Sequence, residues 1–374
     1  MTIRQSLVSV LTFAIVLSPA AVFDAFGADS VSTSLASNKV PAKNKTAAQT
    51  SVPNAKKEKA KALNVKPKLV SLVERRIDGM YVKERRANRW PVAVMIDNFP
   101  TARPQAGLDR ASVVYEALAE GGIPRFMAVF AERGMPMVGP VRSARPYFVQ
   151  YAMEYTAAFV HAGGSDDAQE LLKASHLVNI EGIKGKTAKY FYRGTRYYNN
   201  VHDLFTTGDK LQQYLATTRA EKLTPNYRPW RFINSPSKTK RGKEGQGVTI
   251  NLGAGSSYII DYRYDPKQNA YLRFTGGKPH LDRITKQHIA VKNVLLLRVP
   301  KEKVLDYKGR LALKTLGSDR GVLFQNGKAI TIRWNKRSNR DRTIIRTLNG
   351  KEADMVRGST WITIVPRGHS YRIF

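Results

Sequence analysis

Two glutamates lie four residues apart in the stretch VVYEALAEGGIPRF, residues 113–126. Paired carboxylates hydrolyse glycosidic bonds when their carboxyl groups lie about 5 Å apart in retaining enzymes, or about 6.5–9.5 Å apart in inverting ones. On a helix, Glu116 and Glu120 would be about 6 Å apart, whereas on a strand they would be about 13 Å apart. The local secondary structure therefore decides whether this pair can do acid–base chemistry.

The residues on each side of Gly121-Gly122 are apolar and favour a hairpin, with a helix over residues 113–120 as the competing prediction. A tight turn at the two glycines would pair Leu118 with Arg125. Arg125 would then lie diagonal to both glutamates and could bridge them. This geometry favours a structural ion network. There are two alternatives. One is a ligand site made by Glu116 and Arg125, and the other is a hydrolytic pair made by Glu116 and Glu120.

Three further charged residues are candidates for a site. Asp97 ends the apolar run PVAVMI, where α/β folds often place functional carboxylates, although a turn hydrogen bond to its own backbone explains it equally well. Arg142 and Arg145 lie at the start of an expected helix, where cations oppose the helix dipole. We expect a nearby acid, such as Asp97 or Glu116, or an anionic ligand to compensate them.

The six histidines are scattered and form no metal-binding motif. His161 and His202 could meet Asp97 only through the fold, so we assign no metal and no cofactor. HAGGSDD, residues 161–167, resembles a phosphate-binding strand–loop–helix, but its two aspartates would repel a phosphate. His161 and His202 remain candidates for ligand binding together with the three arginines.

A band of aromatic and cationic residues marks the second half of the chain. Such residues on a sheet stack on bases or sugars, but more often they are a sheet face with half of its residues in the core. Both interpretations stay open. The band consists of Tyr258, Tyr262, Arg263, Tyr264, Tyr271, Arg273, Arg333 and Trp334.

The composition is that of a basic globular protein without cysteine. The chain has 374 residues, 62 Lys plus Arg against 29 Asp plus Glu, and a formal net charge of +33. Such an excess indicates a polyanionic neighbour, which could be nucleic acid, an acidic wall polymer or a membrane surface. The absence of cysteine excludes thiol catalysis, disulfides, thiolate metal sites and the lipid attachment of a bacterial lipoprotein.

The N-terminal segment predicts export. Residues 1–28 have the pattern of a secretory signal peptide, with Arg4 ahead of the apolar run Leu7–Leu17 and small residues at the expected cleavage site. That run is too short to span a bilayer, and the rest of the chain predicts no transmembrane span. Residues 29–68 are rich in Lys, Ser, Ala and Pro and predict a disordered tether. Export argues against nucleic acid as the partner.

The remaining chain alternates helix and strand signals and then becomes rich in strands. We predict an α+β fold with a mixed α/β domain at residues 69–228, a basic linker at 229–247 and a β-rich domain at 248–374. Asn326-Gly327 and Asn349-Gly350 predict tight hairpin turns. Ser143 is expected to cap a helix near residues 147–155, and Ser165 the helix that follows it.

Several strings together resemble the YerB family of bacterial envelope proteins, over about residues 75–366. They are VMIDNFPTARPQAGLDRASVVYEALAEGGIPRF, GPVRSARPYFV and HAGGS in the first part, and YDPKQNAYLRF, GKPHLDRITKQHIAVKNVLL and GSTWITIVP in the second. The resemblance implies an exported protein with a mixed α/β first part and a β-rich second part. It supplies no catalytic residues, because the family has no established activity.

The chain departs from the family pattern in two places. It has no cysteine for lipid attachment, and NNVHDLF stands where the family tends to have Pro-His-Asn-Leu-Tyr, which leaves the role of His202 open. We expect an extracytoplasmic binding or scaffold module for an anionic envelope polymer or an envelope protein. The alternative is a cell-wall polymer hydrolase that uses Asp97, Glu116 or Glu120 as acid and base.

Overall fold

The computed structural model describes residues 71–194, 201–218, 220, 224–242 and 246–374. The expected signal peptide, the expected tether and part of the expected linker lie outside the described residues, and the domain boundaries stay predictions. None of the described helices is long and apolar enough to cross a membrane.

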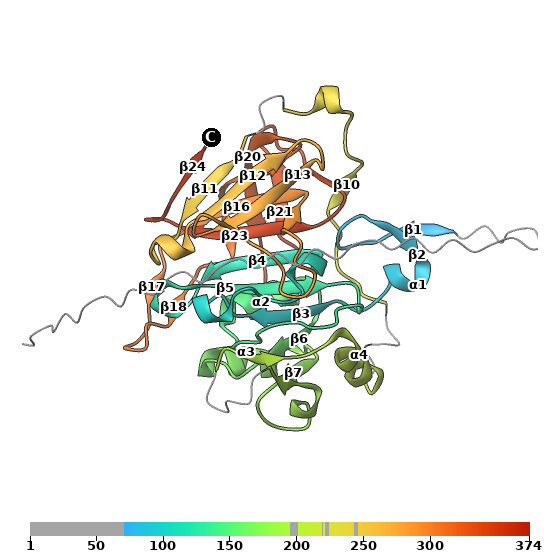
Figure 1. Cartoon of the computed structure of the whole chain (residues 1–374), viewed down its shortest axis with the longest axis vertical. Helices are drawn as coiled ribbons and strands as arrows, with labels where there is room; N and C mark the ends of the chain where they lie inside the picture. The colour runs from blue at the N-terminus through green and yellow to red at the C-terminus, as the bar shows by residue number, and fades with distance from the viewer. Residues whose placement is uncertain (1–70, 195–200, 219, 221–223, 243–245) are drawn as a thin grey trace, which may run out of the picture. The chain divides into compact units, whose positions relative to one another are not determined.

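A mixed ten-stranded sheet is the centre of the structure, and both halves of the chain contribute to it (Figure 1). The central contact is between β23 and β4, which run parallel with Thr363 beside Glu116. The strands, in spatial order, are β21 (Ile344–Thr347), β20 (Lys328–Lys336), β19 (Gly317–Gln325), β16 (Asn293–Val299), β23 (Thr360–Pro366), β4 (Val113–Leu118), β5 (Pro124–Phe130), β3 (Val92–Ile96), β6 (Ala158–His161) and β7 (Asn179–Glu181).

The middle strands are buried on both faces, which explains why their sequences are continuous apolar runs. Every residue of β3, β4, β5 and β23 is buried. Side chains alternate between two cores: Val92, Val94 and Ile96 face one, and Ala93 and Met95 face the other. The sheet therefore separates two apolar layers.

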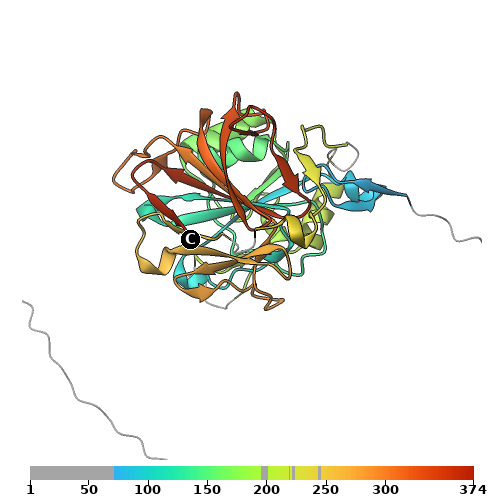
Figure 2. The same ribbon diagram turned by 90° about the horizontal axis from the view of Figure 1, so that it is seen from above.

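A six-stranded antiparallel sheet from the second half of the chain packs in the first core layer, through residues such as Ile250, Ile260 and Tyr262. The C-terminus, marked in Figures 1 and 2, ends its edge strand β24. The strands are β11 (Val248–Asn251), β12 (Ile260–Asp265), β13 (Ala270–Thr275), β14 (Lys278–Pro279), β15 (Ala290–Val291) and β24 (Ser370–Ile373).

The helices lie on both faces of the ten-stranded sheet. α2 (Pro146–Met153) and α3 (Asp166–Ser175) contribute to the second core layer, and α4 (Gly208–Ala216) to the first. The remaining elements are α1 (Glu84–Ala87) and the two-stranded pairs β1 (Leu72–Glu74) with β2 (Tyr81–Lys83), β8 (Tyr192–Arg193) with β9 (Leu204–Phe205), β10 (Arg231–Ile233) with β22 (Asp354–Val356), and β17 (Lys303–Val304) with β18 (Leu311–Ala312).

The predicted α+β class is confirmed, and so is the turn at Asn326-Gly327. Both of its residues have positive φ and connect β19 to β20, as a two-residue hairpin requires. The predicted cap at Ser143 is wrong: α2 begins two residues later, with Arg145 at the N-cap position and Pro146 following. Proline suits the first helical position because its missing N–H would have no partner there.

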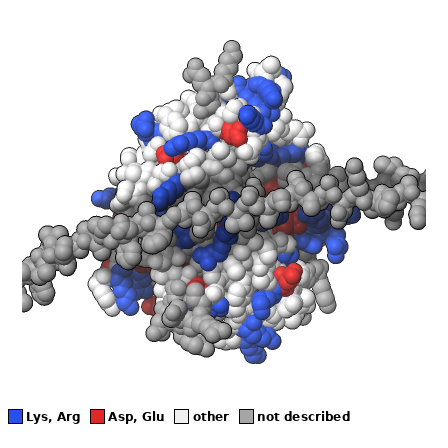
Figure 3. Space-filling view, viewed as in Figure 1, with Lys and Arg blue, Asp and Glu red and all other residues white. Residues whose placement is uncertain are grey.

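Positive charge is spread over the part of the surface that Figure 3 draws. On the face drawn in Figure 3, Lys and Arg side chains are scattered over both the upper and the lower half, and Asp and Glu are few. Many of the 29 acidic side chains in the sequence are instead buried or half-buried partners of arginine. Three such clusters fasten the halves of the chain to one another.

The first cluster is the ion pair between Glu116 of β4 and Arg273 of β13. Their side chains are 0% exposed, and Arg273 Nη2 lies 2.8 Å from Glu116 Oε1. Trp361 Nε1 donates to the other carboxylate oxygen at 2.9 Å, and the Arg273 guanidinium lies 4.6 Å from the centre of the Trp361 ring. The pair therefore joins the two sheets through the first core layer.

The second cluster is centred on Glu154, just after α2, on the opposite face of the ten-stranded sheet. Its carboxylate lies 3.0 Å from Lys336 Nζ and 2.8 Å from Arg342 Nη1. It also accepts from the backbone and hydroxyl of Thr343 at 3.1 and 2.6 Å. Burial alone would raise the pKa of Glu154, but Lys336 and Arg342 outweigh it and lower that pKa.

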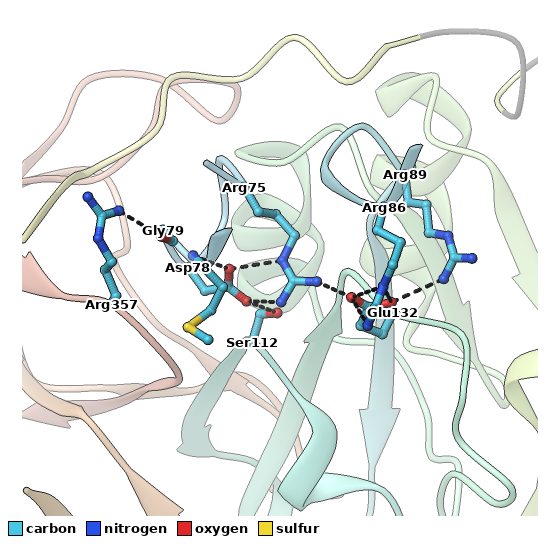
Figure 4. Close-up of polar contacts among 9 residues, drawn as sticks. Arg75, Asp78, Gly79, Arg86, Arg89, Ser112, Glu132 and Arg357 are labelled. Carbon is cyan, nitrogen blue, oxygen red and sulfur yellow. Dashed lines mark hydrogen bonds and ion pairs between the residues drawn. The ribbon is translucent and has the colours of Figure 1, made fainter. Parts of the chain in front are cut away.

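The third cluster fixes the first described hairpin (Figure 4). Arg75 donates to Asp78 from Nε at 2.9 Å and from Nη2 at 2.7 Å. Glu132, at the end of β5, is shared by Arg75, Arg86 and Arg89. Arg357, from the second half of the chain, donates to the Gly79 carbonyl at 2.7 Å.

Replacing Glu116 with Gln should lower the free energy of unfolding by about 3–5 kcal/mol, because it leaves the buried Arg273 cation without a counter-charge. Urea denaturation would measure the loss. The control is Asp354→Asn, which breaks the exposed pair with Arg231 and should cost less than about 1 kcal/mol. Equal losses in the two variants would contradict the assignment of Glu116 as a structural residue.

The stabilisation supplied by Glu154 should depend on pH. Because its folded-state pKa is lowered, its contribution is present above the unfolded pKa of about 4.3 and disappears as pH falls through the folded value. The difference in unfolding free energy between wild type and Glu154→Gln should therefore be largest above about pH 5 and shrink below about pH 4. Denaturant titrations across pH would test this, and a constant difference would refute it.

Candidate functional site

Five of the candidate residues line one pocket of about 230 Å³, named here the Asp97 pocket. It lies where β3 ends and the β4–β5 connection begins. Asp97, Glu120, Arg125, Arg142 and His202 line it together with Phe99, Ile123 and Pro124. The sequence therefore identified all five of its titratable residues, but it did not show that they meet.

The predicted register of the β4–β5 hairpin is wrong by one residue. Leu118 pairs with Pro124, and Ala117 with Arg125, because the connection is the three-residue turn Glu120–Gly122 instead of two glycines alone. A shift of one residue moves a side chain to the other face of a strand. Arg125 therefore lies on the face opposite Glu116 and cannot bridge the two glutamates.

Glu120 instead binds two arginines. Arg125 Nη2 donates to Glu120 Oε2 at 2.9 Å, and Arg145 Nε contacts Glu120 Oε1. Burial would raise the pKa of Glu120, but the two guanidinium groups lower it. Burial and the neighbouring Arg145 lower the pKa of Arg125. One carboxylate thus holds two cations that repel each other.

Asp97 likewise has two nitrogen partners. His202 Nδ1 lies 2.6 Å and Arg142 Nε 3.1 Å from Asp97 Oδ2. The other oxygen, Oδ1, accepts from the Phe99 backbone at 2.9 Å, so the turn hydrogen bond expected from the sequence is present as well. The carboxylate is 6% exposed. Asp97 therefore fixes the turn and also orients the imidazole and the guanidinium.

Backbone contacts position these side chains before any ligand binds. Asp97 N–H donates to Pro140 O at 2.8 Å, and Arg142 N–H donates to Met95 O at 3.0 Å. The Phe99 ring stacks on His202, with centroids 4.6 Å apart and planes 12° from parallel. The polar groups of the pocket are therefore held in place at the end of β3, an interior strand of the sheet.

Three candidates do not line the Asp97 pocket: Arg145, Glu116 and His161. Arg145 is connected to it only through its contact with Glu120. Glu116 belongs to the buried pair with Arg273, and His161 is buried between the Gly163 carbonyl and Asn179 Oδ1, both at 2.7 Å. The loop that resembled a phosphate cradle already has an anion: Gly163 N–H donates to both oxygens of Glu181, at 3.0 and 3.1 Å. That loop therefore serves the fold.

Most of the aromatic and cationic band of the second half is core. Tyr258, Tyr262, Tyr271, Arg273 and Trp334 are buried, which favours the sheet-face interpretation over a stacking surface. Phe99, Ile123 and Pro124 are pocket residues that the sequence did not reveal, because each looks like an ordinary loop or strand-end residue. Among the described residues, no group of three or more His, Asp or Glu side chains is arranged to hold a metal ion.

Comparison with known proteins agrees with this architecture. Residues 78–221 match the N-terminal domain and residues 248–362 the C-terminal domain of a family described as "Protein of unknown function (DUF3048)". A protein of Bacillus subtilis (strain 168) named "Putative lipoprotein YerB" is 33% identical over 291 residues, which is 78% of this chain and 85% of that protein. The chain belongs to the YerB family.

The crystal structure of YerB from Bacillus subtilis matches the fold with a TM-score of 0.69 and 30% identity, covering 80% of this chain and 99% of that one. The YerB family is described by two domain models, but in this chain the two matched regions share one continuous sheet. They do so because β4 of the first region pairs with β23 of the second. The fold resemblance expected from the sequence is thus confirmed.

Glu120→Gln should lower the free energy of unfolding by about 1–3 kcal/mol, because Arg125 and Arg145 lose the charge that they share in a largely buried site. Thermal or urea unfolding would measure it. Asp166→Asn is the control, since Asp166 is 97% exposed and lies 3.7 Å from Arg310. A neutral effect of Glu120→Gln would show that the arginines do not need this carboxylate.

Proposed function

We propose that this YerB-family protein is an exported binding module whose Asp97 pocket takes an anionic group of a cell-envelope polymer. The supporting observation is the charge balance around the pocket. Three guanidinium groups, from Arg125, Arg142 and Arg145, share two carboxylates, from Asp97 and Glu120. One positive charge is left over among these five groups.

The size of the pocket fits one group of a polymer rather than a whole ligand. Sites for drug-sized molecules usually measure about 300–1,000 Å³, and this pocket has about 230 Å³. Guanidinium and imidazole donors suit carboxylate and phosphate oxygens. The location rests on the expected signal peptide at residues 1–28 and on the name of the relative, which describes a lipoprotein.

The hydrolase alternative has less support. A glycosidase needs one carboxyl group with a raised pKa that stays protonated as the general acid. Glu120 has a lowered pKa because Arg125 and Arg145 outweigh its burial, and Asp97 is bound by Arg142 and His202. Glu120 is thus held as an anion by its two arginines, and Asp97 already binds two nitrogen partners, which suits the orientation of cations.

The test is cosedimentation of the protein with purified cell-wall sacculi at low and high salt. Wild type should sediment at low salt and be released at high salt. Arg142→Gln should weaken binding about tenfold, because it removes one of the three guanidinium groups and with it the net positive charge of the cluster. The control is Arg85→Gln: Arg85 is exposed on α1 and has no side-chain partner among the described residues. Equal binding by both variants would refute a role for the Asp97 pocket.

Mass spectrometry of the supernatants from the same samples tests the alternative function, a cell-wall polymer hydrolase. Release of wall fragments by wild type, but not by a folded Asp97→Asn variant, would replace the binding module with a hydrolase. No release by either protein is the expected result.

A further inference from the structure

A second pocket lies beside β21, the edge strand of the ten-stranded sheet. It measures about 480 Å³, roughly twice the Asp97 pocket, and falls within the usual range for ligand sites. We name it the arginine pocket because five of its lining residues are arginines and one is acidic: Arg228, Arg337, Arg340, Asp341, Arg342 and Arg346.

Most of this positive charge has no acidic partner within the structure. Arg228 pairs with Glu352, and Arg342 with Glu154. Among the residues that the structure describes, no carboxylate lies within salt-bridge distance of Arg337, Arg340 or Arg346. Asp341 is thus the single acidic lining residue beside three arginines that have no acidic partner, and the pocket carries a positive excess.

Arg342 forms a buried floor for the pocket. The residue is 5% exposed, and its guanidinium carbon lies 3.6 Å from the centre of the Trp230 ring and 4.3 Å from that of Tyr155. Its Nη1 binds Glu154 at 2.8 Å, whereas its buried Nε has no hydrogen-bond partner. A buried N–H without a partner costs free energy that a ligand oxygen could recover.

The carboxylate of Glu154, which binds Arg342, has more than one cationic partner. Glu154 neutralises both Lys336 and Arg342, whose side chains are 0% and 2% exposed. Two buried cations thus share one carboxylate, and one of them, Arg342, lines the pocket. Buried charge of this kind calls for a counter-ion.

The loop that carries the arginines is held in place by the same cluster. Lys336 Nζ donates to the carbonyls of Asn339 and Asp341 at 3.1 and 2.9 Å. Trp230 Nε1 donates to Thr343 O at 2.9 Å, which ties the loop to the segment that carries Arg228. A site fixed before binding loses less conformational entropy when a ligand arrives.

We propose that the arginine pocket is a second binding site, separate from the Asp97 pocket, and that it takes a phosphate group of a soluble polyanionic chain. Successive phosphate groups of such a chain each carry a negative charge and acceptor oxygens, so together they can bind several guanidinium groups at once, whereas one carboxylate brings a single negative charge. The volume leaves room for the unit to which the phosphate is attached.

A soluble chain fits the pocket better than a membrane surface. Binding to a bilayer needs exposed apolar side chains that enter the lipid as well as cations. The arginine pocket is concave, and Tyr227 and Ile344 are its mainly apolar lining residues. It supplies charge and hydrogen bonds at its floor, where a lipid headgroup would have to leave the plane of the bilayer to reach them.

The test is titration calorimetry of the whole exported protein with inorganic tripolyphosphate at low salt. Wild type should bind, and Arg337→Gln/Arg340→Gln should bind at least tenfold more weakly. Both residues are exposed and without acidic partners in the described chain, so the variant should fold. The matched control is Arg85→Gln/Arg320→Gln, which removes two exposed arginines elsewhere and should change affinity less than twofold.

Two results would overturn the proposal. Equal weakening in the two double variants would mean that binding follows overall charge, and no weakening in Arg337→Gln/Arg340→Gln would place the phosphate elsewhere. Arg142→Gln separates the sites, because it should leave this binding event intact. Phosphatidylglycerol vesicles form a further arm: binding to vesicles that depends on Arg337 and Arg340, without binding of tripolyphosphate, would replace the soluble chain with a membrane.

Discussion

The ion pair between Glu116 and Arg273 is the interaction on which the arrangement of the two halves depends. It is fully buried, and its partners come from β4 and β13, so neither half can satisfy its charge alone. Taking such a pair apart would leave an uncompensated charge in a low-dielectric core, which costs several kcal/mol. Trp361 completes the cluster from β23, the strand that pairs with β4. Sheet pairing and ion pairing therefore specify the same association.

Glu154 repeats this arrangement on the opposite face of the sheet, where Lys336 and Arg342 come from the second half of the chain. The two matched family regions are thus fastened together on both sides of a shared sheet.

This shared sheet also supports the two pockets. Because the sheet is a rigid support, the loops around it can hold charged side chains in fixed positions. The Asp97 pocket lies at the end of the interior strand β3, and the arginine pocket lies beside the edge strand β21.

The sequence predicted the elements better than their contacts. The apolar run PVAVMI, the Asn-Gly turn and the family strings gave β3, the β19–β20 hairpin and the fold class, because these are local signals. The β4–β5 register could not be derived, since one residue more or less in a glycine turn reverses every side chain. The role of Glu116 was equally hidden, because Arg273 lies far along the chain. The contact between His202 and Asp97 could not be predicted either, because the two residues are 105 positions apart in the sequence.

The shortage of acidic residues explains why cation clusters recur in this protein. With 62 Lys and Arg against 29 Asp and Glu, a buried carboxylate commonly serves more than one cation: Glu120 and Glu154 each hold two, and Glu132 holds three. Around Glu132 the excess positive charge costs little free energy, because Arg86 is 50% exposed and water solvates it. Around Glu154 and Glu120 the cations are buried, and one of each pair, Arg342 and Arg125, lines a pocket. There water solvates them poorly, and an anionic ligand can replace the missing carboxylate.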